Sequence, residues 1–226
     1  MLTFYPHLEI LPPAQQQLWP ELRPAADLGF ILYGGTAIAL QLGHRQSIDF
    51  DFFSNIKLDK NLLRNTFPFF KTALLLQDRE ESLTVSVPFL DATTVKISFL
   101  GNLSFGRVGE PHLTHDSVMQ VASLEDLMAT KLKVLFQRVE SKDYLDIAAM
   151  IHEGVSLAHG LSAASTMFGS SFQASECLKA LTYFHGGDLH LLTEETKKTL
   201  IAASSAVHDL PMVNLLSSKL GNRGRL

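Results

Sequence analysis

Apolar positions along the chain change their spacing near residue 120, from the alternation of strands to the periodicity of helices. Residues 29–33 predict a short buried strand and residues 48–53 a strand with one apolar face. Three later segments alternate or run apolar like strands: 73–77, 83–87 and 93–100. Residues 101–116 are rich in Gly, Pro and His and predict a loop, which a short strand follows at 118–121. Ser123 begins the first helix predicted beyond this strand, and Asp126 completes a near capping box there. Ser141 is expected to cap a second helix over 142–151. Three more helices are predicted over 157–168, 172–184 and 193–207.

Shorter helices are predicted before that change, over residues 13–28, 36–42 and 57–67. The first contains Pro20 and is expected to be broken or to start late, because proline interrupts a helix. These elements predict an α+β fold, with a small mixed β-sheet and flanking helices over residues 1–120 and a helical domain over residues 121–226.

Two aspartates alternate with apolar residues in the predicted strand 48–53. Side chains alternate between the faces of a strand, so Asp49 and Asp51 share one face while Phe50 and Phe52 share the other. Two carboxylates this close repel each other unless a cation lies between them, and Mg²⁺ prefers such oxygen ligands. The pattern predicts a metal site, and its alternative is the wet face of a half-exposed strand.

A glycine pair lies between the predicted strand 29–33 and the short helix that follows it. Gly34 and Gly35 thus stand at a helix start, where backbone N–H groups form an anion site. Thr36 is placed to cap that helix or to offer its hydroxyl to a phosphate. Glycine pairs commonly do no more than relieve a tight turn. The combination of this pair with the acidic strand that follows is a more specific indication of an anion site.

Together these residues resemble the first motif of the polymerase-beta-like nucleotidyltransferase superfamily, which joins the glycine pair to the acidic strand. The residues from Gly34 to Ser54 are most similar to the AbiEii/AbiGii toxin family of abortive-infection and toxin–antitoxin nucleotidyltransferases. A second motif of that family is matched by Lys131, Arg138, Lys142, Asp143 and Asp146. The resemblance covers roughly residues 30–152.

The resemblance implies transfer of a nucleoside monophosphate from a nucleoside triphosphate (NTP) to an acceptor hydroxyl, with release of pyrophosphate. Asp49 and Asp51 would then hold Mg²⁺ or Mn²⁺, and Gly34, Gly35 and Thr36 would cradle the phosphates. The helical domain is expected to close over the active site. The toxin-like residues favour an RNA acceptor such as tRNA, and a separately encoded antitoxin is the expected protein partner.

One strand departs from the superfamily's pattern, which takes a third carboxylate from a later strand on the face of the aspartate pair. In residues 93–99 the polar face carries Lys96 and Ser98, and the acid is expected at Ser98. A serine lacks the negative charge that a second metal ion needs, so a two-metal mechanism is in doubt. Asp91 is the alternative if the strand register differs.

Two charged residues occupy the apolar stripes of adjacent predicted helices. Lys131 is centred in one stripe, and Asp143 shares the other with Ile147 and Met150. One interpretation is a partly buried salt bridge that fixes how the helices pack. The resemblance favours another, in which Lys131 contacts triphosphate oxygens and Asp143 orients Lys131 or a metal-bound water.

The remaining charged residues of this motif are expected to support that pair. Arg138 lies on the face of Lys131 and is expected to help bind the nucleotide, while Lys142 and Asp146 support the pair without taking part in the reaction.

Composition narrows the class of protein without selecting a function. The 226 residues allow one large domain or two small ones, and a net charge of −4 argues against broad electrostatic binding to nucleic acid, although a local basic groove remains compatible. The single cysteine, Cys177, excludes an intrachain disulfide and suits a reducing cytosol. Without a signal-peptide pattern or an apolar run of about 18 residues, a cytoplasmic protein with no membrane span is expected.

Two other functions fit the same residues. A relative that has lost its third acid would bind nucleotide or a partner protein without turnover. An antibiotic or small-metabolite nucleotidyltransferase would use the same motif, and the acidic net charge favours it slightly. The sequence does not indicate the base, the acceptor, the oligomeric state or the antitoxin.

Overall fold

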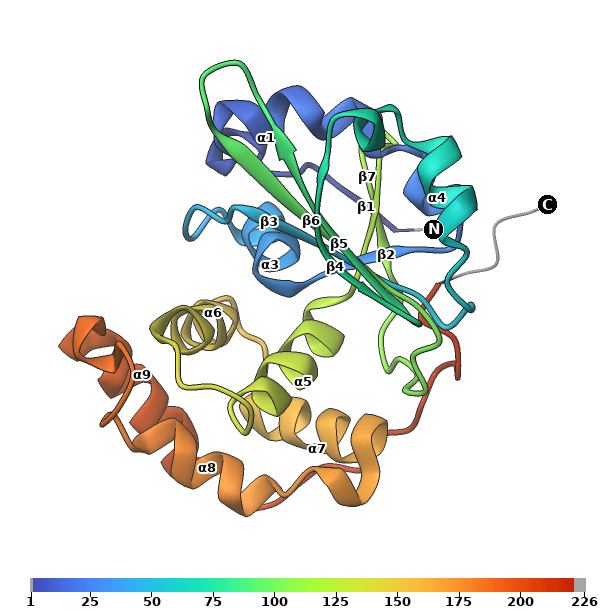
Figure 1. Ribbon diagram of the computed structural model, residues 1–226. Coiled ribbons are helices and arrows are strands. Elements are labelled where there is room, and N and C mark those ends of the chain that lie inside the picture. The colour runs from blue at the N-terminus through green and yellow to red at the C-terminus, as the bar shows by residue number, and fades with distance from the viewer. Residues whose placement is uncertain (1, 222–226) are drawn as a thin grey trace. The chain divides into compact units, whose positions relative to one another are not determined.

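The predicted strands pair into a mixed sheet in the computed structural model, which describes residues 2–221 (Figure 1). Within those residues the sheet has eight strands in the order β1-β7-β8-β2-β3-β6-β5-β4. They are β1 (Thr3–Phe4), β2 (Ile31–Tyr33), β3 (Asp49–Phe53), β4 (Leu74–Arg79), β5 (Ser82–Pro88), β6 (Thr94–Leu100), β7 (His112–Thr114) and β8 (Gln120–Val121). The mixed sheet with flanking helices confirms the predicted fold class.

The chain divides into two units. The sheet unit contains the described residues up to Phe105, Glu110–Ala122 and the residues from Ser218 on, and the helical unit contains Gly106–Gly109 and Ser123–Ser217. The domain boundary expected at residue 120 lies two residues before the change at Ala122. Two short segments differ from that division, because Gly106–Gly109 goes with the helices and the residues from Ser218 on go with the sheet.

Aromatic residues fill the core of the sheet unit. Phe50 and Phe52 on β3 are fully buried, and the ring of Phe52 stacks on that of Phe99 with centroids 5.2 Å apart. Phe67 packs on Phe99 from the segment after α4 (Lys60–Thr66). Burying one such side chain contributes roughly 1.5–3 kcal/mol. The apolar face of β3 therefore anchors the strand and turns its two aspartates to the opposite face.

Helices cover both faces of the sheet unit. Helix α1 (Pro13–Leu18) and α4 lie on one side and α3 (Gly34–Leu42) on the other (Figure 1). The segment predicted as one helix over 13–28 is broken, as Pro20 suggested, into α1, the 3-10 helix Trp19–Leu22 and α2 (Pro24–Asp27).

Two strands were missed by the sequence prediction. β7 lies in a segment predicted as loop, β1 in one assigned to no element, and they pair in parallel at one edge of the sheet. Strands of two and three residues are too short to show an alternating pattern, so their pairing comes from the tertiary fold.

The helical unit contains α5 (Leu124–Val134), α6 (Ser141–His152), α7 (Leu157–Phe168), α8 (Ala174–Thr182) and α9 (Glu194–Ser205). Helices α5 and α7 approach closely, because a Cβ added to Gly160 would collide with Met128. Ser123 caps α5 as predicted, by accepting a hydrogen bond from the Asp126 N–H. Among the described residues, no helix is long and apolar enough to cross a membrane.

Ser141 was wrongly predicted as the residue that caps α6. It is the first residue of that helix, after Glu140, and donates its N–H and hydroxyl to Asp188 at 2.5 and 2.8 Å. The carboxylate of Asp188 comes from a turn 47 residues further along the chain, so the local sequence gives no sign of it.

Candidate active site

The predicted site residues fall into two sets, one in each unit. In the sheet unit, Asp49 and Asp51 stand half-buried on β3, on the face opposite Phe50 and Phe52. The parallel register with β6 places Lys96 beside Asp49 and Ser98 beside Asp51. The two carboxylates therefore share a partly solvated face, as the alternation predicted.

Lys96 forms an ion pair with the first of these acids. Its Nζ donates to Asp49 Oδ2 at 2.9 Å, and the two side chains are 43% and 30% exposed. An ion pair this open to water contributes about 0–1 kcal/mol, because solvent screens both charges. Replacing Lys96 by a divalent cation at this carboxylate would therefore cost little free energy.

The glycine pair brings the backbone close to the second acid and to a cation. Gly34 has φ of +76°, and a Cβ there would lie 2.7 Å from Asp51 Oδ2. A Cβ at Gly35 would collide with the guanidinium of Arg45 and lie 3.2 Å from Ser47 Oγ. Gly34 thus requires glycine both for its backbone conformation and for the close approach of Asp51, whereas a side chain at Gly35 would displace the end of Arg45. An anion at the start of α3 would meet Arg45 together with the backbone amides.

Thr36 was predicted to cap the helix or to offer its hydroxyl to a phosphate, and in the structure its hydroxyl bonds within the protein. It is buried, and its hydroxyl donates to Ser47 Oγ at 2.8 Å or to the main-chain carbonyl of Asp49. The helix begins two residues earlier, at Gly34, with Tyr33 as its N-cap residue and no side-chain cap. Thr36 therefore does not cap α3 and instead ties its first turn to the start of β3.

No third carboxylate joins the aspartate pair. Ser98 is the neighbour of Asp51, as expected, and Asp91 lies in an exposed turn where it accepts hydrogen bonds from the N–H and hydroxyl of Thr93. Asp91 therefore does not substitute through a shifted register. In the part of the chain that the structure describes, no group of three or more His, Cys, Asp or Glu side chains is placed to hold a metal ion.

The second set forms a buried ionic cluster in the helical unit. Lys131 Nζ lies 2.7 Å from Asp143 Oδ1 and 2.7 Å from Asp146 Oδ2, and both carboxylates are fully buried. Arg138 donates to both oxygens of Asp143, from Nε at 2.8 Å and from Nη2 at 3.0 Å. Lys142 contacts the cluster through Glu140, whose Oε2 lies 2.8 Å from Lys142 Nζ and 3.6 Å from Arg138 Nε.

Charges balance within this cluster. Burial alone would raise the pKa of Asp143, but the hydrogen bond from Arg138 and the charge of Lys131 hold that pKa below its usual range. Asp146 contacts the Lys131 ammonium as closely as Asp143 does, so the two acids hold it jointly. The arrangement matches the predicted buried salt bridge, extended by Arg138 and Asp146.

Sequence reasoning assigned Asp126 only to the start of α5. This carboxylate is buried and accepts hydrogen bonds from the N–H of Val108 and the hydroxyl of Ser123, both at 2.8 Å. Burial raises the pKa of Asp126 to about 6, against the lowering effect of these hydrogen bonds. Asp126 fastens the segment Gly106–Gly109 to α5, through partners that only the fold brings together.

A mixed sheet that carries an Asp-x-Asp strand beside a glycine-pair helix start is the arrangement that the resemblance to nucleotidyltransferases led us to expect. The chain matches the profile of the nucleotidyl transferase AbiEii toxin family of type IV toxin–antitoxin systems over residues 21–208, and it belongs to that family. Membership implies an NTP substrate and an antitoxin partner.

Comparison with solved structures agrees on the fold. A crystal structure of an H. pylori protein described as a nucleotidyltransferase is similar with a TM-score of 0.56 and 19% sequence identity, over 86% of this chain and 92% of that one. No curated protein matches the chain.

Proposed function

We propose that this nucleotidyltransferase transfers a nucleoside monophosphate to a hydroxyl of RNA, such as tRNA, in a reaction that depends on Mg²⁺ or Mn²⁺. The observation that carries the proposal is the closeness of Asp51 to Gly34, where a metal ligand meets the start of a helix. Asp51 would help to hold a divalent ion there, and the backbone N–H groups at the start of α3 would bind phosphate oxygens.

The donor set suits a hard cation. Asp49 and Asp51 offer carboxylate oxygens on a partly solvated face, and Mg²⁺ combines one or two carboxylates with waters and phosphate oxygens. When bound, such an ion neutralises charge on the transferred phosphate and its leaving group.

Residues of the chain supply the rest of the phosphate site in this proposal. The backbone of Gly34 and Gly35 and the guanidinium of Arg45 receive phosphate oxygens, and Thr36 holds α3 against β3 so that this geometry is fixed. Lys131 and Arg138, within the helical unit, are proposed to contact nucleotide phosphates, and Arg138 is the more accessible of the two, with 42% of its side chain exposed. Asp143 and Asp146 orient the Lys131 ammonium.

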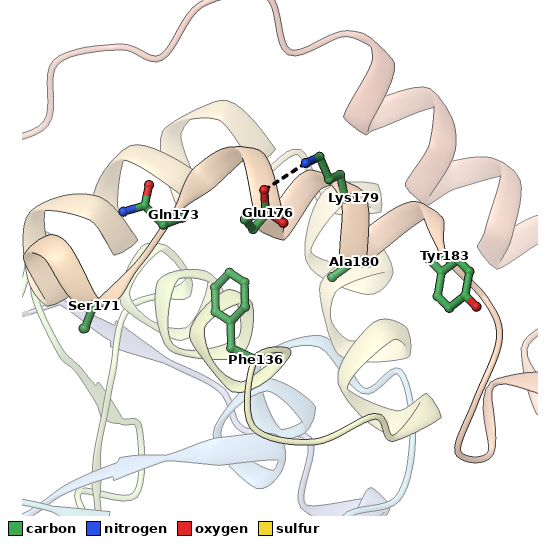
Figure 2. Close-up of a pocket in the computed structure, with 7 residues that line it drawn as sticks. All are labelled: Phe136, Ser171, Gln173, Glu176, Lys179, Ala180 and Tyr183. Carbon is green, nitrogen blue, oxygen red and sulfur yellow. Dashed lines mark hydrogen bonds and ion pairs between the residues drawn. The ribbon is translucent and has the colours of Figure 1, made fainter.

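A hollow in the helical unit supports a nucleic-acid acceptor. It has a volume of about 610 Å³, and Figure 2 shows Phe136 pointing toward α8, which Tyr183 follows. The two residues are 41% and 64% exposed, and Lys133 lies 5.9 Å from the centroid of the Phe136 ring. Exposed rings next to a cation stack nucleobases of any sequence. The hollow is lined by Phe136, Ser171, Gln173, Glu176, Lys179, Ala180 and Tyr183.

The test is a transfer assay with defined substrates. Purified protein and its Asp49→Ala/Asp51→Ala variant are incubated with each α-labelled NTP, Mg²⁺ and deproteinised total RNA. Label in a discrete RNA band with the unaltered protein alone is expected, and the band identifies nucleotide and acceptor together.

Two other results would redirect the proposal. Label that enters only small metabolites would replace RNA with a small-molecule acceptor. NTP-dependent thermal stabilisation without any labelled product would show a nucleotide-binding protein that lacks turnover.

A further inference from the structure

We propose that Lys96 takes the place of a third carboxylate at the aspartate pair, so that the site binds one divalent ion per chain and not two. The proposal rests on the proposed function, because it concerns the same metal site. It makes Lys96 a positioning residue for Asp49.

The sheet register gives the first argument. Lys96 and Ser98 on β6 are the neighbours of Asp49 and Asp51, and the next strand, β5, places Ser86 beside Lys96 and Thr84 beside Ser98. The two strands next to the acids on this side of the sheet thus offer one ammonium and three hydroxyls at these positions, and no carboxylate. A second hard cation would find no charged ligand there.

Charge gives the second argument. The two carboxylates face the ammonium of Lys96, and the guanidinium of Arg45 lies at the adjoining glycine pair, so the site carries too little negative charge to attract two divalent ions. A second such ion would approach against both the first ion and Lys96, whose Nζ already lies 2.9 Å from Asp49 Oδ2. Lys96 thus supplies a fixed positive charge where another site would recruit a metal.

The ion pair also fixes a side chain. Asp49 lies on a partly solvated face, and the hydrogen bond from Lys96 favours the rotamer that places Oδ2 at the ammonium. Lys96 competes with a metal ion for Asp49 Oδ2, so removing the ammonium makes this oxygen available to the ion. The same change leaves the Asp49 side chain less well ordered. Loss of Lys96 is therefore expected to tighten metal binding and slow transfer, and a purely structural role does not predict this combination.

The test counts metal ions. Mn²⁺ is titrated into the full chain, with free Mn²⁺ followed by electron paramagnetic resonance, both alone and with a non-hydrolysable NTP analogue. One Mn²⁺ per chain is expected for the unaltered protein. Lys96→Asp is expected to bind two, because it completes a set of three acids, and Ser98→Asp offers a second route to the same set if the first variant does not fold.

Lys96→Met is the matched control, since it removes the charge without adding a ligand. It should keep one Mn²⁺ per chain, bind it about three- to tenfold more tightly and transfer more slowly. Two ions in the unaltered protein, a single ion in both acidic variants, or unchanged affinity in Lys96→Met would overturn the proposal. Absence of Mn²⁺ binding in every variant would instead contradict the metal site of the proposed function.

Discussion

The two sets of charged residues combine the same chemistry, lysine with aspartate, in opposite surroundings. The pair of Lys96 and Asp49 is open to water, whereas Asp143 and Asp146 are fully buried around Lys131. An exposed pair adds little stability, and breaking a buried one is costly because it strands a charge. The sheet unit therefore leaves the Lys96–Asp49 pair open to water, and the helical unit uses its buried acids to hold its own cations.

The largest expected effect tests the buried side of this comparison. Asp143→Ala leaves Lys131 and Arg138 without their shared carboxylate, and the free energy of unfolding should fall by about 3–5 kcal/mol. Chemical denaturation measures it. Asp49→Ala, the matched change at the exposed pair, should alter the same quantity by less than about 1 kcal/mol. Equal losses in the two variants would show that the contrast in burial has no energetic meaning.

Measurements of stability over a range of pH test Asp126, a buried acid of the helical unit outside the Lys131 cluster. The pKa of Asp126 is raised to about 6 in the folded protein. The folded protein thus holds a proton that the unfolded chain releases above about pH 4. The stability that this proton contributes is present at low pH and is lost as the pH rises through about 6.

Asp126→Asn removes this titration. Between pH 4 and 7 the free energy of unfolding of the unaltered protein should fall by on the order of 1–3 kcal/mol relative to that of Asp126→Asn. Chemical denaturation at each pH measures this difference. Taking the difference between the two proteins cancels the other groups that titrate in this range. A difference that stays constant with pH would contradict the raised pKa.

The hollow in the helical unit predicts a smaller effect that is confined to the acceptor. Phe136→Leu and Tyr183→Leu keep apolar bulk and lose the ring, so each should weaken RNA binding by about 1–3 kcal/mol if a base stacks there. Filter binding with the labelled acceptor RNA measures this loss, and NTP binding should be unchanged. If both variants bind RNA as the unaltered protein does, the acceptor lies elsewhere.

Local patterns in the sequence predicted the parts of the site that depend on a single element. Alternation along β3 placed Asp49 and Asp51 on one face, and helical periodicity placed Lys131 and Asp143 on buried stripes. Both follow from side-chain direction alone.

The remaining features depend on contacts between distant segments. Asp49 and Lys96 are 47 positions apart, as are Ser141 and Asp188. Arg45 was missed although it lies between the glycine pair and the acidic strand, because only the folded turn brings it against Gly35.

We propose that the aspartate pair on β3 holds the metal ion of the transfer reaction. The most direct measurement compares transfer by Asp51→Asn with that of the unaltered protein, with nucleotide binding and thermal stability measured on the same samples. Asp91→Asn is the control, since Asp91 is an exposed aspartate bonded within its own turn. We predict that Asp51→Asn loses at least about a thousandfold in rate, roughly 4 kcal/mol, with its fold retained, while Asp91→Asn stays active. Full transfer by a folded Asp51→Asn variant would contradict the account.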